Sequence, residues 1–139
     1  MLGTIAELGA KLADLCEIQA EWSQKVFGLD GNRSPIGALR HLAKEAVEAE
    51  EAYVLSAGHP KAQRREDWNG AFVGPLEEHA KLKEELADCF LLILDASRRS
   101  GVKPMQLLEA ALDKMKVNTS RKWPKPQDDQ PVEHLKEDE

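Results

Sequence analysis

Cysteine is scarce in this chain, which has only Cys16 and Cys89 among its 139 residues. Their separation fits no zinc-binding motif, and both lie among apolar positions of helical segments, so we expect buried free thiols in a reducing compartment. The longest unbroken apolar run, Cys89–Leu94, is far too short to cross a bilayer, and the N-terminus lacks the pattern of a signal peptide. These absences predict a cytoplasmic protein with no membrane partner.

Glycine-rich phosphate-binding loops are missing as well. No segment matches GxxxxGKS or GxxxxGKT, GxGxxG after a strand, or the GxSxG turn of covalent hydrolases. The net charge of −6 argues against a general nucleic-acid binder, because affinity for a phosphate backbone needs clustered lysine and arginine. A bound metal, however, can hold a free nucleotide even on an acidic protein. Any phosphate chemistry must therefore use a metal and carboxylates.

The chain does have helical periodicity, and no strand pattern competes with it. Glycine and proline separate the segments, with Gly28 and Gly101 as stop signals and Pro104 as a start signal. Four helices with short or medium links predict an all-α fold, a helical bundle. The segments run from about Thr4 to Phe27, from Ser34 and Pro35 to near Gly58 and Pro60, from about Leu76 to Ser100, and from Pro104 to about Lys122.

The chain is long enough for one domain with a core, but not for two. We place this domain at residues 1–123. Residues 58–75 hold most of the turn formers, so we expect a surface insertion between the second and third helices. Residues 124–139 carry three prolines and mostly charge, which predicts a tail without a core of its own.

The third helix has apolar side chains around its whole circumference between residues 86 and 96. A helix that is apolar all round is expected to be buried all round. A domain this small cannot cover such a helix on every side. The pattern therefore predicts an oligomeric core, with a partner subunit that covers what one monomer leaves open.

Two pairs of acids lie at the edges of apolar helical faces. Glu45 and Glu48 are spaced i, i+3 on the second helix, and Glu85 and Asp88 repeat this spacing on the third. Four carboxylates that converge inside a bundle repel one another unless a cation lies between them. Mg²⁺ suits such a site because it takes oxygen ligands, and Mn²⁺ can replace it. No ExxH pair is present, which argues against di-iron redox chemistry.

A solvated helix face is the competing interpretation of the same acids. The Glu-x-x-Glu spacing usually marks a surface with lysine partners, and Lys44, Lys81 and Lys83 could be those partners. The apolar surroundings of both acid pairs favour a metal site instead. On the residues alone, the two interpretations stay level.

A line of polar donors continues the apolar stripe of the fourth helix. Lys114, Asn118 and Arg121 are spaced i, i+4, i+7 and therefore share one face. Basic residues in a last turn also complement the helix dipole, which explains their sign but not their inward face. Arginine as a fork and lysine as a point charge are suited to anchoring a triphosphate, so we favour that role.

Two residues of the first helix are candidates for a base pocket. Trp22 could stack on a base, and Gln19, one turn earlier, could hydrogen-bond to its edge. Core packing is the competing and more usual role of a tryptophan at helical spacing.

Three further residues are candidates for supporting the acids. His41 and Lys44 stand beside Glu45 on the second helix. Asp95 lies two turns after Asp88 on the same face of the third helix. It could pair with a neighbouring arginine or extend the site.

The segments that carry these residues resemble a known family. KEAVE, KEELAD and KxxxNxxR resemble the MazG-like all-α nucleoside triphosphate pyrophosphohydrolases, whose signature is ExxE followed by ExxD on neighbouring helices. GALRHLAKEAVEA, ELADCFLLILDASRRSG and KMKVNTSRKWPKP resemble more closely the branch described as dATP/dGTP pyrophosphohydrolases. One departure is the longer gap between Glu48 and Glu85, caused by the 58–75 segment. We expect the acids to keep their register, because this insertion lies between helices.

The resemblance implies a Mg²⁺-dependent reaction in which water attacks the α-phosphorus of a purine (d)NTP and releases (d)NMP and pyrophosphate. It implies that Glu45, Glu48, Glu85 and Asp88 are metal ligands and that one of them activates the water. It further implies that Lys114, Asn118 and Arg121 contact phosphate or sugar, that Trp22 and Gln19 contact the base, and that the chain forms a homodimer or homotetramer. Two alternatives stay open. One is a related hydrolase that prefers dCTP or dUTP or that releases single phosphates, and the other is a helical interaction module without turnover.

Overall fold

The computed structural model describes residues 4–57, 76–125 and 130–136. These residues form four α-helices, one short 3-10 helix and no strand, which confirms the predicted all-α class. The predicted insertion at residues 58–75 lies outside the described residues. The elements are α1 (Ile5–Phe27), η1 (Asp30–Asn32), α2 (Ile36–Ala57), α3 (Leu76–Arg99) and α4 (Pro104–Ser120).

Local capping explains where the helices begin and end. Thr4 and Glu7 form a capping box at the start of α1: the Thr4 N–H donates to the Glu7 carboxylate at 2.6 Å, and the Glu7 N–H donates to the Thr4 hydroxyl at 3.2 Å. At the end of α3, Gly101 has a φ of 79° and the Val102 N–H donates to the Ser97 carbonyl at 2.9 Å. The predicted ends agree with the observed ones to within two residues.

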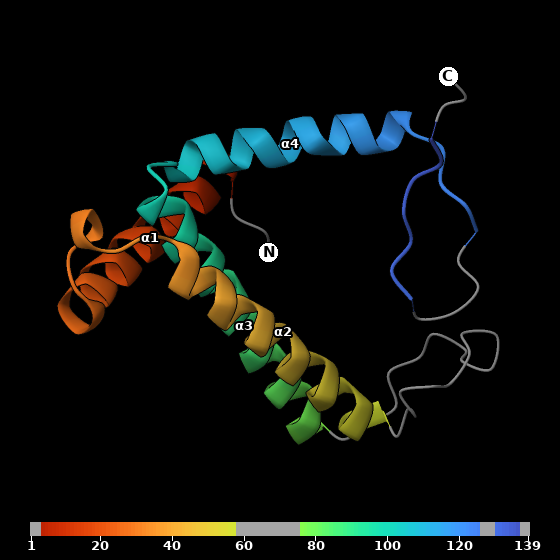
Figure 1. The fold of residues 1–139 in the computed structure, drawn as a ribbon, viewed down its shortest axis with the longest axis horizontal. Helices are drawn as coiled ribbons and strands as arrows, with labels where there is room; N and C mark the ends of the chain where they lie inside the picture. Colours follow the sequence, from red (N-terminus) through yellow and green to blue (C-terminus); the bar gives the residue numbers. More distant parts are fainter. Residues whose placement is uncertain (1–3, 58–75, 126–129, 137–139) are drawn as a thin grey trace.

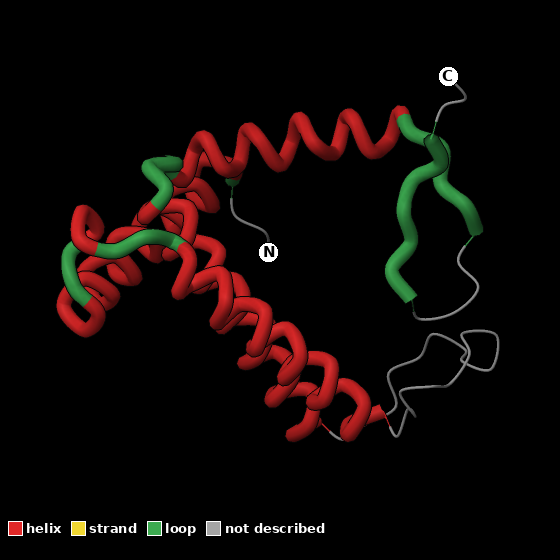
Figure 2. The backbone as a smooth tube through the Cα atoms, in the orientation of Figure 1, coloured by secondary structure: helices red, strands yellow, loops and turns green. Residues whose placement is uncertain are grey.

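The helices α2 and α3 run antiparallel, side by side, over most of their lengths (Figure 1). The helix α1 packs near the C-terminal end of α3, where η1 also contacts α3. The helix α4 leaves this corner and runs away from the α2–α3 pair, as the tube in Figure 2 also shows. The four helices therefore do not close into a bundle within one chain.

The core formed by the described residues is small and rich in alanine. Ala49 and Ala52 of α2 are buried, as are Leu94 and Ala96 of α3. Small side chains let two helix backbones approach closely, so the facing side chains of the two helices also come close together. This close packing brings the acids of the two helices within reach of one another.

Within one chain the outer face of α3 is exposed, and its burial by a partner subunit stays a prediction. Leu86 is 55% exposed, Phe90 45% and Ile93 40%. A single neighbouring helix covers one side of a helix, and α1 reaches only one end of α3. Burial on every side would need a second chain.

The helix α4 has no buried residue. Several of its large apolar side chains are exposed, including Leu112 at 65%, Met105 at 61% and Met115 at 58%. Among the described residues, no helix is both long and apolar enough to cross a membrane.

Candidate functional site

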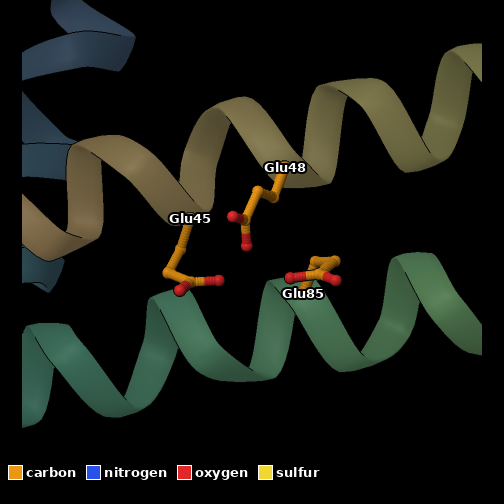
Figure 3. Close-up of side chains that lie close together, drawn as sticks. All are labelled: Glu45, Glu48 and Glu85. Carbon is orange, nitrogen blue, oxygen red and sulfur yellow. The ribbon is translucent and has the colours of Figure 1, made fainter.

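Three of the four predicted acids converge between α2 and α3. Glu45 and Glu48 project from α2 toward Glu85 of α3 (Figure 3). Each offers one carboxylate oxygen, and these three oxygens all lie within 4.8 Å of one another. Glu45 is 8% exposed and Glu85 is 5% exposed, whereas Glu48 is half-buried. We call these three residues the acidic cluster.

Each acid of the cluster has a basic partner one turn away on its own helix. His41 Nε2 lies 2.7 Å from Glu45, Lys44 Nζ lies 3.3 Å from Glu48, and Lys81 Nζ lies 2.5 Å from Glu85. The two lysine side chains are 68% and 61% exposed. Ion pairs at this exposure contribute little stability. The lysine partners of the solvated-face interpretation are therefore present, but one of the two acids they pair with, Glu85, is buried.

The two glutamates of α2 perturb each other. Burial raises the pKa of Glu45, and the adjacent Glu48 carboxylate raises it further. The hydrogen bond with Glu45 lowers the pKa of Glu48, as does the Lys44 ammonium. Two carboxylates that share one site split their pKa values in this way because both cannot carry a charge at low cost. A cation placed between them would remove the conflict.

The acidic cluster fits a hard divalent metal ion. Its donors are all carboxylate oxygens, the ligands that Mg²⁺ prefers. Ligand oxygens lie about 2 Å from Mg²⁺, so carboxylates already within 4.8 Å of one another need only small side-chain adjustments. The three residues could therefore hold one metal ion, with positions left for water and a substrate.

Asp88, the fourth predicted acid, stands apart from the cluster. It is exposed, and the group of three that could hold a metal does not include it. It does line the same cavity as Glu45. Asp88 thus borders the acidic cluster from the side on which a ligand would enter.

A cavity of about 270 Å³ lies beside the acidic cluster, and we call it the front cavity. Trp22 and Phe27 of α1 form part of its wall, with ring centroids 5.4 Å apart and planes at 88°. Trp22 is 55% exposed, so it does not pack in the core as a tryptophan at helical spacing usually does. The remaining lining residues are Gln19, Ser23, His41, Glu45, Asp88, Leu91, Leu92 and Asp95.

The floor of the front cavity is a buried polar network centred on Asp95. Gln19 Nε2 donates to Asp95 at 2.9 Å, and Ser23 Oγ donates to it at 2.6 Å. Arg98 and Arg99 also donate to this carboxylate, at 2.7 and 2.9 Å. Burial alone would raise the pKa of Asp95, but these hydrogen bonds hold it well below its usual range.

This network bears on the sequence predictions for Gln19 and Asp95. The amide oxygen of Gln19 accepts a hydrogen bond from Arg98 while its amide nitrogen donates to Asp95, so Gln19 mainly joins α1 to α3. Asp95 pairs with both arginines, which is one of the two roles predicted for it, and it lies nearly three helical turns from Glu85 of the acidic cluster. Sequence reasoning missed Ser23, although it lies on one helix face with Gln19 at i, i+4.

The basic line of α4 does not reach the acidic cluster within one chain. Lys114 is exposed, and Asn118 and Arg121 are half-buried. Trp123 Nε1 donates to the Asn118 carbonyl at 2.8 Å, so the segment after α4 folds back on its end. Because α4 runs away from α2 and α3, the predicted inward face of this line has no interior to face in one monomer (Figure 1).

Comparisons with known proteins bear on the same elements. A family model described as dATP/dGTP pyrophosphohydrolase matches residues 67–139. This range includes Glu85, Asp88 and the basic line of α4, but not Glu45 and Glu48. The Eaa protein of Salmonella phage P22 is 40% identical over 53 residues, which are 38% of this chain and 17% of that protein's length. No solved structure matches the chain significantly.

Proposed function

The chain belongs to the dATP/dGTP pyrophosphohydrolase family of nucleoside triphosphate hydrolases, and we propose that it uses Mg²⁺ to convert a purine (d)NTP into (d)NMP and pyrophosphate. The observation that carries this proposal is the acidic cluster. Glu45 and Glu85 are buried on two different helices, yet their carboxylates lie within 4.8 Å of each other and of Glu48. Such an arrangement destabilises a protein unless a cation compensates it.

The proposed ligands come from both helices. Glu45, Glu48 and Glu85 hold the metal, and Asp88 completes the oxygen donors at the edge of the front cavity. The contact of 2.7 Å with His41 keeps the Glu45 carboxylate oriented. A bound Mg²⁺ offsets the charge of the phosphates and lowers the pKa of water, and Mn²⁺ can serve the same purpose.

The proposed reaction is a single displacement. The oxygen of a water molecule forms a bond to the α-phosphorus, and the bond from that phosphorus to the oxygen bridging to the β-phosphorus breaks. Pyrophosphate leaves with the electron pair of the broken bond. A carboxylate of the site takes a proton from the attacking water as general base.

We also propose that the active form is a homo-oligomer. The exposed apolar side chains of α3 and α4 would be covered by a second copy. Such a copy would bring Lys114, Asn118 and Arg121 of its α4 to the phosphates held at the first copy's acids. The three donors suit this role because arginine and lysine both bind phosphate oxygens.

The function is tested by incubating the protein with each dNTP and rNTP, with and without Mg²⁺, and separating the products by chromatography. We expect the purine nucleotides to yield monophosphate and pyrophosphate, and chelation with EDTA to abolish turnover. Restoring Mg²⁺ or Mn²⁺ to the chelated sample should recover activity, which controls for irreversible damage.

Other products would point to the competing functions. Diphosphate with phosphate would show cleavage at a different bond, and turnover of dCTP or dUTP alone would show a pyrimidine enzyme. If no nucleotide is hydrolysed with any metal, the chain is a helical interaction module and the proposed reaction is wrong.

A further inference from the structure

A second, smaller cavity adjoins the front cavity, and we call it the rear cavity. It measures about 110 Å³ and shares Phe27, His41, Leu92 and Asp95 with the front cavity. Pockets for whole drug-sized ligands are about 300–1,000 Å³, so the rear cavity suits one end of a ligand that enters through the front cavity.

Two arginines line the rear cavity. Arg33 is held in place because its Nη1 donates to the Phe27 carbonyl at 2.9 Å and its guanidinium lies 5.5 Å from the centroid of the Phe27 ring. Gly37 lies next to it, and a Cβ at that position would come within 3.4 Å of Arg33 Nη2. The absence of a side chain at Gly37 therefore leaves this edge of the guanidinium open.

Arg99 is the second arginine, and its side chain is only 3% exposed. Its Nε donates to Asp95 and its Nη2 to Ser23, both at 2.9 Å. Its Nη1 forms a long ion pair with Asp30 Oδ1 at 3.7 Å, and neither atom has a hydrogen-bond partner among the described residues. A buried donor without a partner is costly, and a ligand acceptor would satisfy it.

We propose that the rear cavity holds the base of the nucleotide and that Arg33 selects a 6-oxopurine such as guanine over adenine. This inference rests on the proposed function. Guanine presents two acceptors, O6 and N7, on one edge, and arginine binds them in a bidentate manner. Adenine replaces O6 with an amino donor, so the same guanidinium would meet a donor at that position.

The spacing along α2 fits this placement. Gly37 lines the rear cavity, and Glu45 belongs to the acidic cluster. At a rise of about 1.5 Å per residue, the two are about 12 Å apart along the helix axis. That separation is on the scale of a nucleoside monophosphate from its phosphorus to the far edge of its base. His41, between them, borders both cavities.

The charges around the rear cavity favour a neutral base over a phosphate group. Asp95 lines the cavity together with the two arginines, and Asp30 pairs with Arg98 and lies near Arg99. A carboxylate in the wall repels an anion, while the arginine donors still attract neutral acceptors. The phosphates are therefore expected at the other end, beside the metal.

The test compares nucleotides that differ only at the base edge. We expect the wild-type kcat/KM for dGTP and for dITP to exceed that for dATP by about tenfold or more. Removing N7 with 7-deaza-dGTP should lower kcat/KM as well. In Arg33→Met, the preference for dGTP and the penalty for 7-deaza-dGTP should both disappear, mostly through a higher KM for dGTP with kcat kept.

The exposed Arg40 on the same helix offers a matched control, since Arg40→Met removes an arginine that lines neither cavity. It should keep the wild-type preference. Equal kcat/KM values for dGTP and dATP in the wild type, or an equal loss for both nucleotides in Arg33→Met, would overturn the inference while leaving the proposed reaction intact.

Binding of the monophosphates dGMP and dAMP, measured by calorimetry, separates this inference from turnover. We expect dGMP to bind about tenfold more tightly than dAMP in the wild type and equally in Arg33→Met. Circular dichroism of Arg33→Met checks that this variant folds, which is expected because Arg33 is exposed. Equal affinities of the wild type for dGMP and dAMP would refute guanine selection whether or not any triphosphate is hydrolysed.

Discussion

The α2–α3 pair and the helix α4 carry the two halves of the proposed site, and they differ in what covers them. The acids of α2 and α3 lie against each other in one chain, with Glu45 and Glu85 buried. The basic line of α4 lies on a helix with no buried residue. Amphipathic spacing predicts a functional face in both regions, but only the first region contains its own partner helix.

The same contrast appears in two ion pairs of identical spacing. Asp95 and Arg98 of α3 pair at i, i+3 with side chains 10% and 21% exposed. Asp113 and Lys116 of α4 pair at i, i+3 with side chains 74% and 78% exposed. A buried pair cannot lose one partner cheaply, whereas a solvated pair can. The comparison therefore predicts which substitutions affect chemistry, which affect folding, and which affect neither.

The largest effect is expected in the acidic cluster. Glu85→Gln keeps the size of the side chain but removes a metal-binding charge, so kcat should fall by about a thousandfold or more. The stabilisation of the wild type by added Mg²⁺, measured as a rise in Tm, should also be lost. The matched control is Glu84→Gln, which changes an exposed acid on the same turn.

Near wild-type activity in Glu85→Gln would show that the acidic cluster is a structural feature and not a metal site. A loss of activity in Glu84→Gln of the same size would show that general charge on α3, rather than the cluster, controls turnover. Asp88→Asn distinguishes the lining of the front cavity from the acidic cluster, because Asp88 belongs only to the former.

A smaller effect, on folding, is expected at Asp95. Asp95→Asn leaves Arg98 and Arg99 without their shared carboxylate, which should lower the free energy of unfolding by about 3 kcal/mol. The control Asp113→Asn breaks the solvated pair of α4 and should cost about 0.5 kcal/mol or less. Urea denaturation measures both, and equal losses in the two variants would contradict the assigned difference in burial.

The pH dependence of unfolding sharpens this prediction. The native pKa of Asp95 is lowered, so its contribution to stability is present above its unfolded pKa of about 3.9 and is lost as the pH falls below that value toward the native pKa. Wild-type stability should therefore fall more steeply than that of Asp95→Asn between about pH 5 and pH 2. Parallel curves would mean that folding does not lower the pKa of Asp95.

The helix ends and the acid pairs could be predicted because their signals are local. Gly101 in a left-handed conformation and Pro104 at a first turn act within a few residues. The i, i+3 spacing placed Glu45 and Glu48 on one face without any knowledge of the partner helix. Contacts between α1 and α3 could not be predicted in this way, because Gln19 and Asp95 are 76 residues apart in the chain.

The exposure of α3 and α4 within one chain could not be predicted, for a different reason. Apolar periodicity records the total burial of a helix, including any burial by another chain. It predicts that Leu86 and Phe90 are covered, and the rest of the same chain does not cover them. The inward face assigned to Lys114 and Arg121 has the same cause, since it is inward only if a second copy stands there.

A mixing experiment tests directly whether α4 of one copy serves the acids of another. Arg121→Met alone should lower kcat/KM by about a hundredfold, because it removes a charged donor from the phosphates. Glu85→Gln alone should be inactive. In mixed dimers of the two variants, one site carries both defects and the other carries neither. Random pairing should then restore about a quarter of wild-type activity, because half of the dimers are mixed and each has one intact site.

The mixed oligomers are made by co-expression with two different tags and confirmed by sequential purification. The control uses Lys116→Met in place of Arg121→Met. Lys116 lies on α4 in an exposed ion pair, so this substitution should leave kcat/KM close to the wild-type value. Mixed oligomers that form but show no more activity than their parents would place the basic line with its own chain's acids or outside the reaction. Recovered activity would instead mean that the two regions complete each other across a subunit boundary, so that the exposed face of α4 in one chain is half of a site.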